Sequence, residues 1–213
     1  MFYLVKTPWL FKKIYPECIW DIKTQEKVLY LTFDDGPHPV ATPLVLDELK
    51  KYNAKATFFC IGKNVEEHFD IYKKILDAGH AVGNHTYNHL NGWKTQDAFY
   101  LDNVFKAKKI IDSNLFRPPY GRITKFQLKQ LAAEKYKLKP VMWSVLSGDF
   151  DEVVSGEECY LTVAKNAKEG SVVVFHDSGK ALQRLSYALP LVLKNFSEKG
   201  FQFSSINLKE ITF

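Results

Sequence analysis

Short apolar runs alternate along the chain with longer segments whose apolar residues recur at helical spacing. The apolar runs predict strands over residues 28–33, 56–61, 80–83, 115–117, 140–145, 171–175 and 201–206. The segments between them predict helices over residues 42–51, 64–78, 95–112, 124–136, 157–168 and 182–199. Strands that alternate with helices are typical of parallel βαβ units. About seven such units without a G-x-G-x-x-G or phosphate-loop motif favour a β/α barrel over a nucleotide-binding sheet.

The first predicted strand runs directly into two adjacent carboxylates, Asp34 and Asp35. Neighbouring side chains on a flat strand point to opposite faces, so the pair can serve one site only where the chain bends. Gly36 and Pro37 follow at once and supply such a bend. The carboxyl ends of strands are also where α/β folds build their sites. An ordinary Asp-Gly turn is the alternative for this stretch taken alone.

His85 and His89 follow the third predicted strand and stand four residues apart. This spacing places both on one face of a helical turn. Imidazole suits zinc and other late first-row metals, and two histidines with one carboxylate leave positions open for water and substrate. The pair therefore predicts a metal site, while a structural role is the alternative for each histidine alone.

Three more polar positions follow strand ends. In Arg117-Pro118-Pro119-Tyr120 the prolines have no N–H, so the next free donor is the N–H of Tyr120, which suits an oxyanion. The Arg117 guanidinium can hold a carboxylate, although a stiff loop with an exposed arginine is the alternative. Asp149 and His176 follow two further strands, and His176 is a candidate proton donor. Each of these two could instead be a cap or a surface group.

Taken together, these motifs resemble the polysaccharide deacetylase family, which is also called the NodB homology domain or carbohydrate esterase family 4. The first three family motifs are matched by residues 32–37, His85-Thr86-Tyr87-Asn88-His89 and residues 117–120. The fourth, usually D-x-x-D-W, reads Leu146-Ser147-Gly148-Asp149-Phe150, and the fifth, usually L-x-H, reads Val174-Phe175-His176. These two departures touch the pocket for the acetyl methyl group and put the substrate range in question more than metal binding.

The resemblance runs from about residue 26 to about residue 203 and implies a distorted (β/α)7 barrel. We therefore expect a single catalytic domain over residues 26–213, preceded by an N-terminal arm over residues 1–25 that packs on the barrel. The implied ligands of one divalent metal ion are Asp35, His85 and His89. The implied catalytic groups are the base Asp34 with its partner Arg117, and the acid His176 with its partner Asp149. The implied substrate-binding and oxyanion residues are Tyr120, Phe150 and Val174. Zinc is the expected metal, with cobalt and nickel as alternatives.

The expected function is hydrolysis of N-acetyl groups on an N-acetylhexosamine glycan of peptidoglycan or chitooligosaccharide type. An O-acetyl esterase acting on a polysaccharide such as acetylxylan is the alternative within the same fold. A catalytically silent glycan-binding module is disfavoured because the candidate base, ligands and acid are all present. A magnesium phosphatase is disfavoured because two histidines suit a softer metal.

Composition argues against nucleic-acid binding and against cysteine-based scaffolds or metal sites. The chain has 213 residues and a net charge of +5, without a dense Lys/Arg block, so we expect no nucleic-acid partner. Cys18, Cys60 and Cys159 are far apart and form no C-x-x-C pair, which argues against a disulfide scaffold or a thiolate zinc site.

The first 20 residues contain Trp, Phe and Tyr, but Lys and Pro interrupt every apolar run. The pattern matches neither a signal peptide nor a membrane span. An arm packed on the barrel is the prediction, and contact with a membrane surface is the alternative. We expect a cytoplasmic location or one peripheral to the membrane, with export by another route left open. The oligomeric state is not predicted.

Overall fold

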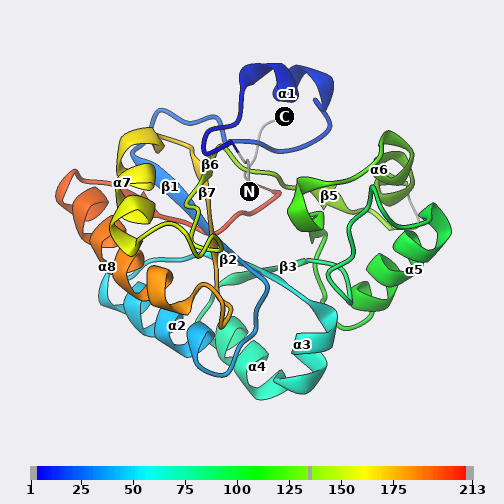
Figure 1. Ribbon diagram of the computed structural model, residues 1–213, viewed down its shortest axis with the longest axis horizontal. Helices are drawn as coiled ribbons and strands as arrows, with labels where there is room; N and C mark the ends of the chain where they lie inside the picture. The colour runs from blue at the N-terminus through cyan, green and yellow to red at the C-terminus, as the bar shows by residue number, and fades with distance from the viewer. Residues whose placement is uncertain (1–3, 134–135, 210–213) are drawn as a thin grey trace.

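A curled parallel sheet forms the centre of the computed structural model, which describes residues 4–133 and 136–209 (Figure 1). In the described part of the chain the strands are β1 (Val28–Asp34), β2 (Thr57–Cys60), β3 (Ala81–Asn84), β4 (Leu115–Phe116), β5 (Lys139–Pro140), β6 (Val145–Leu146), β7 (Val172–His176) and β8 (Gln202–Phe203). Their order is β5-β4-β3-β2-β1-β7-β6, and β8 pairs with β1. The predicted α/β class and single barrel-like domain are confirmed.

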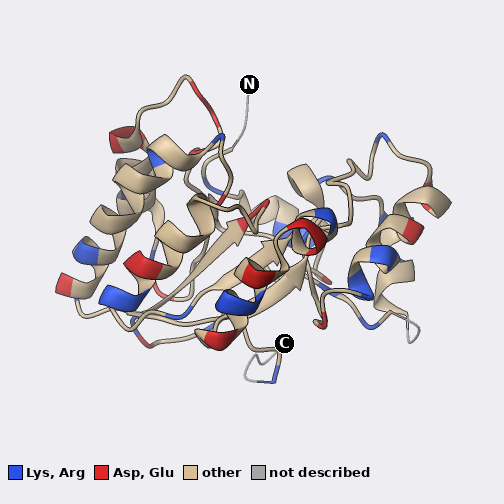
Figure 2. Cartoon of the chain, turned by 90° about the horizontal axis from the view of Figure 1, so that it is seen from below, with Lys and Arg blue, Asp and Glu red and all other residues tan. Residues whose placement is uncertain are grey.

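Helices surround the outer side of the sheet. Their bounds are α1 (Trp9–Ile14), α2 (Ala41–Lys51), α3 (Gly62–Glu67), α4 (Phe69–Asp77), α5 (Asp97–Lys108), the 3-10 turn η1 (Pro119–Gly121), α6 (Lys125–Ala132), α7 (Gly156–Asn166) and α8 (Leu182–Glu198). Successive contacts join α7, α8, α2, α4, α3, α5 and α6 into a curved layer (Figure 1). Figure 2 shows Lys/Arg and Asp/Glu interspersed on the helices, in keeping with the modest net charge.

The core explains why β1 is central. Leu29, Leu31 and Phe33 are fully buried, and β2 and β7 flank the strand with equally buried residues. A parallel strand covered on both faces is expected to be apolar along its whole length. The carboxyl ends of β1, β2, β3 and β7 therefore meet at one end of the barrel, where the polar residues begin.

The structure corrects three of the predicted elements. The helix expected over residues 64–78 is two helices, because His68 has φ −133° and ψ 49° and interrupts the helical backbone. The strand expected over residues 140–145 is split into β5 and β6, which lie at opposite edges of the sheet. Between them, the carbonyl oxygens of Val141 and Met142 accept hydrogen bonds from Arg117. The predicted helix over residues 124–136 ends at Ala132, and positions 134–135 lie outside the described residues.

The N-terminal segment contacts the barrel where β5 and β6 do not pair with each other. Ile19 forms a bridge with Val141, and Lys6 forms a bridge with Val145 at the start of β6. Ile19 is buried together with Trp20. These contacts agree with an arm that packs on the barrel, while the boundary at residue 25 stays a prediction. Residues 1–3 and 210–213 of the expected segments lie outside the described residues.

Two smaller predictions can also be compared with the structure. Cys18, Cys60 and Cys159 are buried and free of disulfide bonds. None of the helices formed by the described residues combines the length and the apolar character that a membrane crossing would need.

Candidate active site

The chain bends at the end of β1, as the Asp-Asp-Gly-Pro sequence predicts. The bend starts at Asp35, whose φ is 77°, so Asp34 and Asp35 are not related as neighbours on a flat strand. Gly36 N–H donates to Asp177 Oδ1 at 3.1 Å, and Asp177 N–H donates to Asp34 O at 3.0 Å. A Cβ atom on Gly36 would lie 2.1 Å from Asp177 Oδ2, so the close approach requires glycine.

Asp177 was not among the predicted site residues, although it directly follows His176. It is fully buried, and burial raises the pKa of its carboxyl to about 8, with the charges of Asp35 and Asp34 acting in the same direction and a hydrogen bond from Thr42 opposing them. Its hydrogen bonds with Gly36 and with the Asp34 carbonyl connect it to the site. The sequence feature that could have indicated a role for Asp177 is its position as an acidic residue directly after a buried strand.

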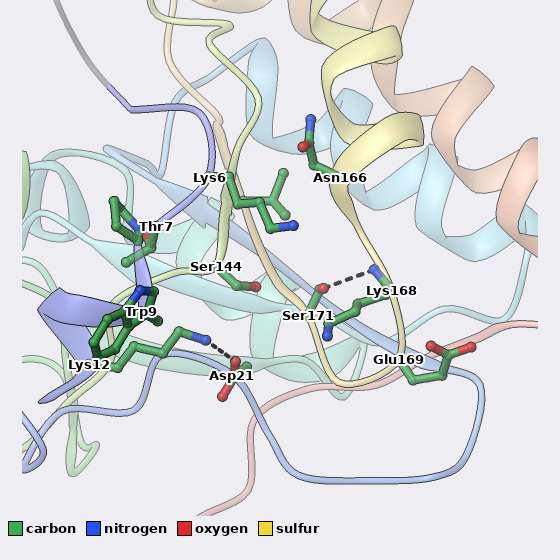
Figure 3. Close-up of a pocket in the computed structure, with 12 residues that line it drawn as sticks. Lys6, Thr7, Trp9, Lys12, Asp21, Ser144, Asn166, Lys168, Glu169 and Ser171 are labelled. Carbon is green, nitrogen blue, oxygen red and sulfur yellow. Dashed lines mark hydrogen bonds and ion pairs between the residues drawn. The ribbon is translucent and has the colours of Figure 1, made fainter.

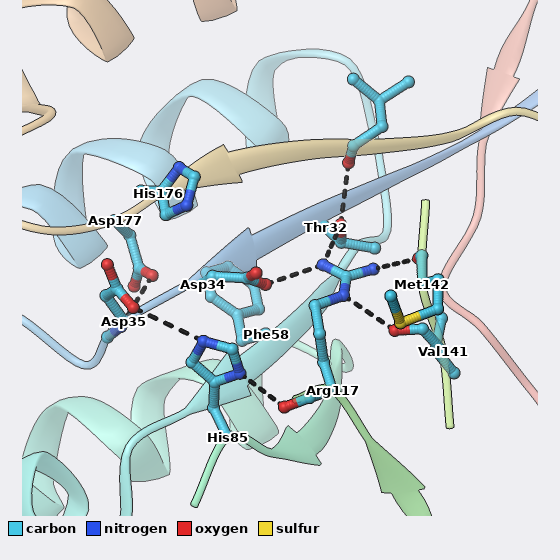
Figure 4. A network of polar contacts seen from close by, with 12 residues as sticks. Thr32, Asp34, Asp35, Phe58, His85, Arg117, Val141, Met142, His176 and Asp177 are labelled. Carbon is cyan, nitrogen blue, oxygen red and sulfur yellow. Dashed lines mark hydrogen bonds and ion pairs between the residues drawn. The ribbon is translucent and has the colours of Figure 1, made fainter. Parts of the chain in front are cut away.

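Arg117 holds Asp34 inside the barrel (Figure 4). Its Nη1 donates to Asp34 Oδ1 at 2.7 Å and to Thr32 Oγ1 at 2.7 Å. Its Nε and Nη2 donate to the carbonyl oxygens of Val141 and Met142 at 3.0 and 2.9 Å. The side chain is fully buried, so the alternative of an exposed arginine is wrong. Burial lowers the pKa of Arg117, and the charge of Asp34 opposes this shift. Arg117 and Asp34 therefore form a buried ion pair whose guanidinium makes several further hydrogen bonds.

Asp35, His85 and His89 form the predicted cluster. One ligand atom from each lies within 4.8 Å of the others. Asp35 Oδ1 is 3.1 Å from His89 Nε2 and 3.6 Å from His85 Nε2. Within the described residues, this buried oxygen has no hydrogen bond of good geometry. Converging lone pairs around an unsatisfied buried oxygen fit a divalent cation.

The protonation states of the cluster also suit a metal. His85 Nδ1 lies 2.8 Å from Arg117 O, which assigns the proton to Nδ1 and leaves the Nε2 lone pair facing Asp35. Burial lowers the pKa of His85 to about 4, so its imidazole is neutral. Burial opposes ionisation of Asp35, but His89, His176 and His85 together hold its pKa well below the ordinary value. Metal ligands must be deprotonated in this way.

The two histidines do not lie on a helical turn, so that part of the prediction is wrong. Thr86 and His89 have φ values of 63° and 56°, and the segment is a loop. Asn84 Oδ1 accepts the Thr86 N–H at 2.8 Å, and Asn103 Oδ1 accepts the Tyr87 N–H at 2.9 Å. These side-chain acceptors replace the carbonyl acceptors of a helix. The loop still brings the two imidazole rings to 5.0 Å between centroids.

Tyr120 lies in η1 on the other side of His89, with its ring centroid 4.7 Å from that imidazole. Its φ is 60°, and its side chain is exposed. No acceptor among the described residues takes its backbone N–H, as the two preceding prolines predict. The structure thus supplies a free donor beside the histidine pair.

His176 and Asp149 form a second buried pair at the end of β7. His176 Nδ1 lies 2.7 Å from Asp149 Oδ1, and its backbone N–H donates to Asp149 Oδ2 at 2.8 Å. Burial opposes protonation of His176, but the charge and hydrogen bond of Asp149 raise its pKa to about 9. Arg184, which was not predicted, fixes this loop by donating from Nε to Asp149 O at 2.6 Å.

The remaining predicted residues lie near this pair. The Phe150 ring is 5.2 Å from the His176 ring, edge to face. Val174 is buried and stands two residues before His176 on β7, so both side chains point to the same face of the sheet. All ten predicted site residues are thus on the strand ends and loops of one end of the barrel.

A separate cavity of about 390 Å³ is shown in Figure 3. It is bounded by the N-terminal arm and by the starts of β6 and β7, including Val145 and Ser171. Lys12 pairs with Asp21 at its edge. None of the predicted site residues lines this cavity, so it is not the site described above.

The comparison with known proteins agrees with this geometry. The profile of the family described as polysaccharide deacetylase matches residues 21–139. The chain belongs to the polysaccharide deacetylase family. Among its relatives in that family is a peptidoglycan-N-acetylglucosamine deacetylase of Bacillus cereus, 36% identical over 194 residues that cover 88% of this chain and 90% of the relative.

Another curated relative and a solved structure show a similar degree of identity. A chitooligosaccharide deacetylase of Azorhizobium caulinodans is 34% identical over 163 residues, covering 73% of this chain and 76% of that protein. A crystal structure of a peptidoglycan N-acetylglucosamine deacetylase superposes with a TM-score of 0.85 at 35% identity, covering 94% of this chain and 95% of that one. Some curated relatives are longer, and the chain spans only 39% of them.

Proposed function

We propose that this protein is a metal-dependent hydrolase that removes N-acetyl groups from N-acetylhexosamine units of a peptidoglycan-like or chitooligosaccharide-like glycan. The observation that carries the proposal is the meeting of three groups at one end of the barrel: a His-His-Asp cluster, a buried carboxylate held by Arg117, and a buried His-Asp pair. The substrate class is supported by the names of the relatives in Bacillus cereus and Azorhizobium caulinodans.

Asp35, His85 and His89 would hold one divalent ion, and we propose zinc because one carboxylate and two imidazoles suit it, with cobalt and nickel as alternatives. When bound, the ion supplies a Lewis acid that polarises the acetyl carbonyl and makes water more acidic. Holding the ion is the role of these three side chains.

Asp34 is the proposed base that takes the proton of the attacking water. Arg117 occupies its Oδ1, so the other carboxylate oxygen is left to accept that proton. Arg117 also donates to Thr32 and to the carbonyl oxygens of the 141–142 segment, which fixes the guanidinium and therefore the direction of Asp34. A positioned base contributes on the order of 10²–10⁴ to the rate.

The Tyr120 N–H is the proposed donor to the oxyanion that develops on the acetyl oxygen. His176, held in its charged form by Asp149, protonates the departing nitrogen. Phe150 and Val174 are proposed to bound the space for the acetyl methyl group, since they lie beside His176 on the same end of the barrel.

The His176–Asp149 pair favours an amide over an ester as the natural substrate. An amine anion is far too basic to leave without a proton, whereas the sugar alkoxide expelled from an O-acetyl group is much less basic and depends less on protonation. A buried, charged imidazole is therefore worth most to an amidase. The O-acetyl esterase alternative uses the same groups but depends less on this pair.

We also propose that the N-terminal arm contacts a membrane surface, which would place the protein peripheral to the membrane. Helix α1 has no buried residue, and the arm exposes the large apolar side chains of Leu4, Trp9, Leu10, Phe11 and Ile14 beside Lys12 and Lys13. Apolar groups flanked by lysines suit an anionic interface. Sedimentation with anionic vesicles, reduced in Trp9→Ala, would support this, and equal recovery with and without vesicles would contradict it.

The function is tested by measuring acetate release from chitotetraose, peptidoglycan fragments and acetylxylan with one metal-replete preparation. Release from either N-acetylated glycan supports the proposal. Release from acetylxylan alone would replace it with the esterase alternative, and release from none of the three would refute both.

A further inference from the structure

A tryptophan and an arginine lie side by side outside the groups with proposed roles. Trp93 is 57% exposed, and the guanidinium carbon of Arg122 lies 4.8 Å from its ring centroid. Among the described residues, no carboxylate pairs with Arg122. The two side chains thus present an aromatic surface and an unneutralised cation together.

This Trp93–Arg122 platform lies next to the proposed site because two loops are joined. The ring of His89 packs on the ring of Tyr120. His89 stands three residues before Gly92, and Tyr120 stands two residues before Arg122. Beyond them, the Gly92 N–H donates to Arg122 O at 3.1 Å, and Trp93 Nε1–H donates to Ile123 O at 3.0 Å. Four residues span at most about 14 Å, so Trp93 lies within the reach of a short oligosaccharide bound at His89.

The platform is held rigidly. A Cβ atom on Gly92 would lie 2.5 Å from Arg122 O, so the two backbones approach each other as closely as only glycine allows. Gln127 is fully buried, and its Nε2 donates to Gly92 O at 2.9 Å and to Asp97 Oδ1 at 2.7 Å. A binding surface that is already fixed loses little entropy when a ligand is bound.

The chemistry of the two side chains selects a class of ligand. The C–H face of a sugar ring can pack on the exposed part of the indole through dispersion and apolar contact. The planar guanidinium binds a carboxylate through two parallel hydrogen bonds. Neither loop, residues 85–96 or 117–124, contains an acidic residue, and Asp97 at the start of α5 is already bound by Gln127.

We propose that Trp93 and Arg122 form a subsite for a carboxylate-bearing sugar next to the one that is deacetylated. The inference rests on the proposed deacetylase function and narrows its substrate to N-acetylated glycans with free carboxylate substituents rather than neutral oligosaccharides.

The test compares acetate release from three substrates: peptidoglycan glycan fragments, the same fragments with amidated carboxylates, and chitotetraose. Arg122→Gln should raise KM for the untreated fragments about tenfold, the effect of one lost charge-assisted contact, with kcat unchanged. KM for the other two substrates should stay within about twofold. Trp93→Ala should raise KM for all three, and Trp93→Phe should restore part of the loss.

Lys125→Gln is the matched control, because its ammonium lies 5.5 Å from the Tyr15 ring and not on the platform. It should change none of the three KM values. An equal effect of Arg122→Gln on all substrates, or no effect of Trp93→Ala, would overturn the subsite. Calorimetric binding of the fragments is measured in parallel. If wild type binds them in an Arg122-dependent way but releases no acetate from any substrate, the subsite stands and the proposed function fails.

Discussion

Asp149→Asn separates the role of the His176 charge from its position. In the wild type the Asp149 charge and its 2.7 Å contact raise the pKa of His176 to about 9 against the effect of burial. Asparagine keeps the shape but removes the charge. Burial then opposes protonation while the charges of Asp35 and Asp34 still favour it, so the pKa of His176 should fall from about 9 toward its ordinary value of 6.5.

The magnitude follows from these values. At pH 8 a histidine with a pKa of about 9 is about nine-tenths protonated, whereas one returned to its ordinary value of about 6.5 is about 3% protonated. If amide cleavage requires the charged imidazole, kcat on an N-acetylglucosamine oligomer should fall at pH 8, by about 30-fold for a full return to that value. Cleavage of an aryl acetate, which does not need the proton, should change much less.

Both rates are measured between pH 6 and 9 on one metal-replete preparation. The loss on the oligomer should shrink toward low pH, because the variant histidine regains its proton there. Ser147→Ala is the control, since it removes the 2.9 Å hydrogen bond to Asp149 Oδ1 but leaves the charge. An equal, pH-independent loss on both substrates would refute leaving-group protonation by His176.

Two further predictions concern the base and the pH dependence of stability. Asp34→Asn should keep the metal but lower turnover by about 10²-fold or more, and near-normal turnover would show that the role is misassigned. Burial lowers the pKa of His80 to about 4, and its Nδ1 accepts the Ala56 N–H, so the folded protein holds it neutral. The unfolded chain takes up this proton below about pH 6.5, so the contribution of His80 to the free energy of unfolding should fall by about 2 kcal/mol between pH 7 and pH 5. Urea titrations should show a smaller fall in His80→Gln, and an identical fall would contradict the assignment.

The sequence was sufficient for features that depend on neighbouring residues. The apolar run of β1 and the turn residues after it predicted a bend that brings Asp34 and Asp35 to one site. The histidine spacing predicted a metal cluster, because four residues keep two imidazoles close in a loop as well as in a helix.

Features set by contacts between distant segments could not be predicted in the same way. The split between β5 and β6 depends on Arg117, which takes the carbonyl oxygens of residues 141 and 142 and is far away in sequence. The clamp of Asp177 on Gly36 joins positions 141 residues apart. In neither contact does the sequence around one residue indicate which distant residue it will bind.

Acetate release should require one metal ion held by Asp35, His85 and His89. The most direct measurement titrates zinc into metal-stripped wild type and His85→Ala while bound metal and acetate release are recorded together. We predict that wild type regains activity in proportion to bound zinc and saturates at about one ion per chain. His85→Ala should bind less zinc and release little acetate. Full acetate release by the stripped protein, or unchanged metal binding in His85→Ala, would contradict the account.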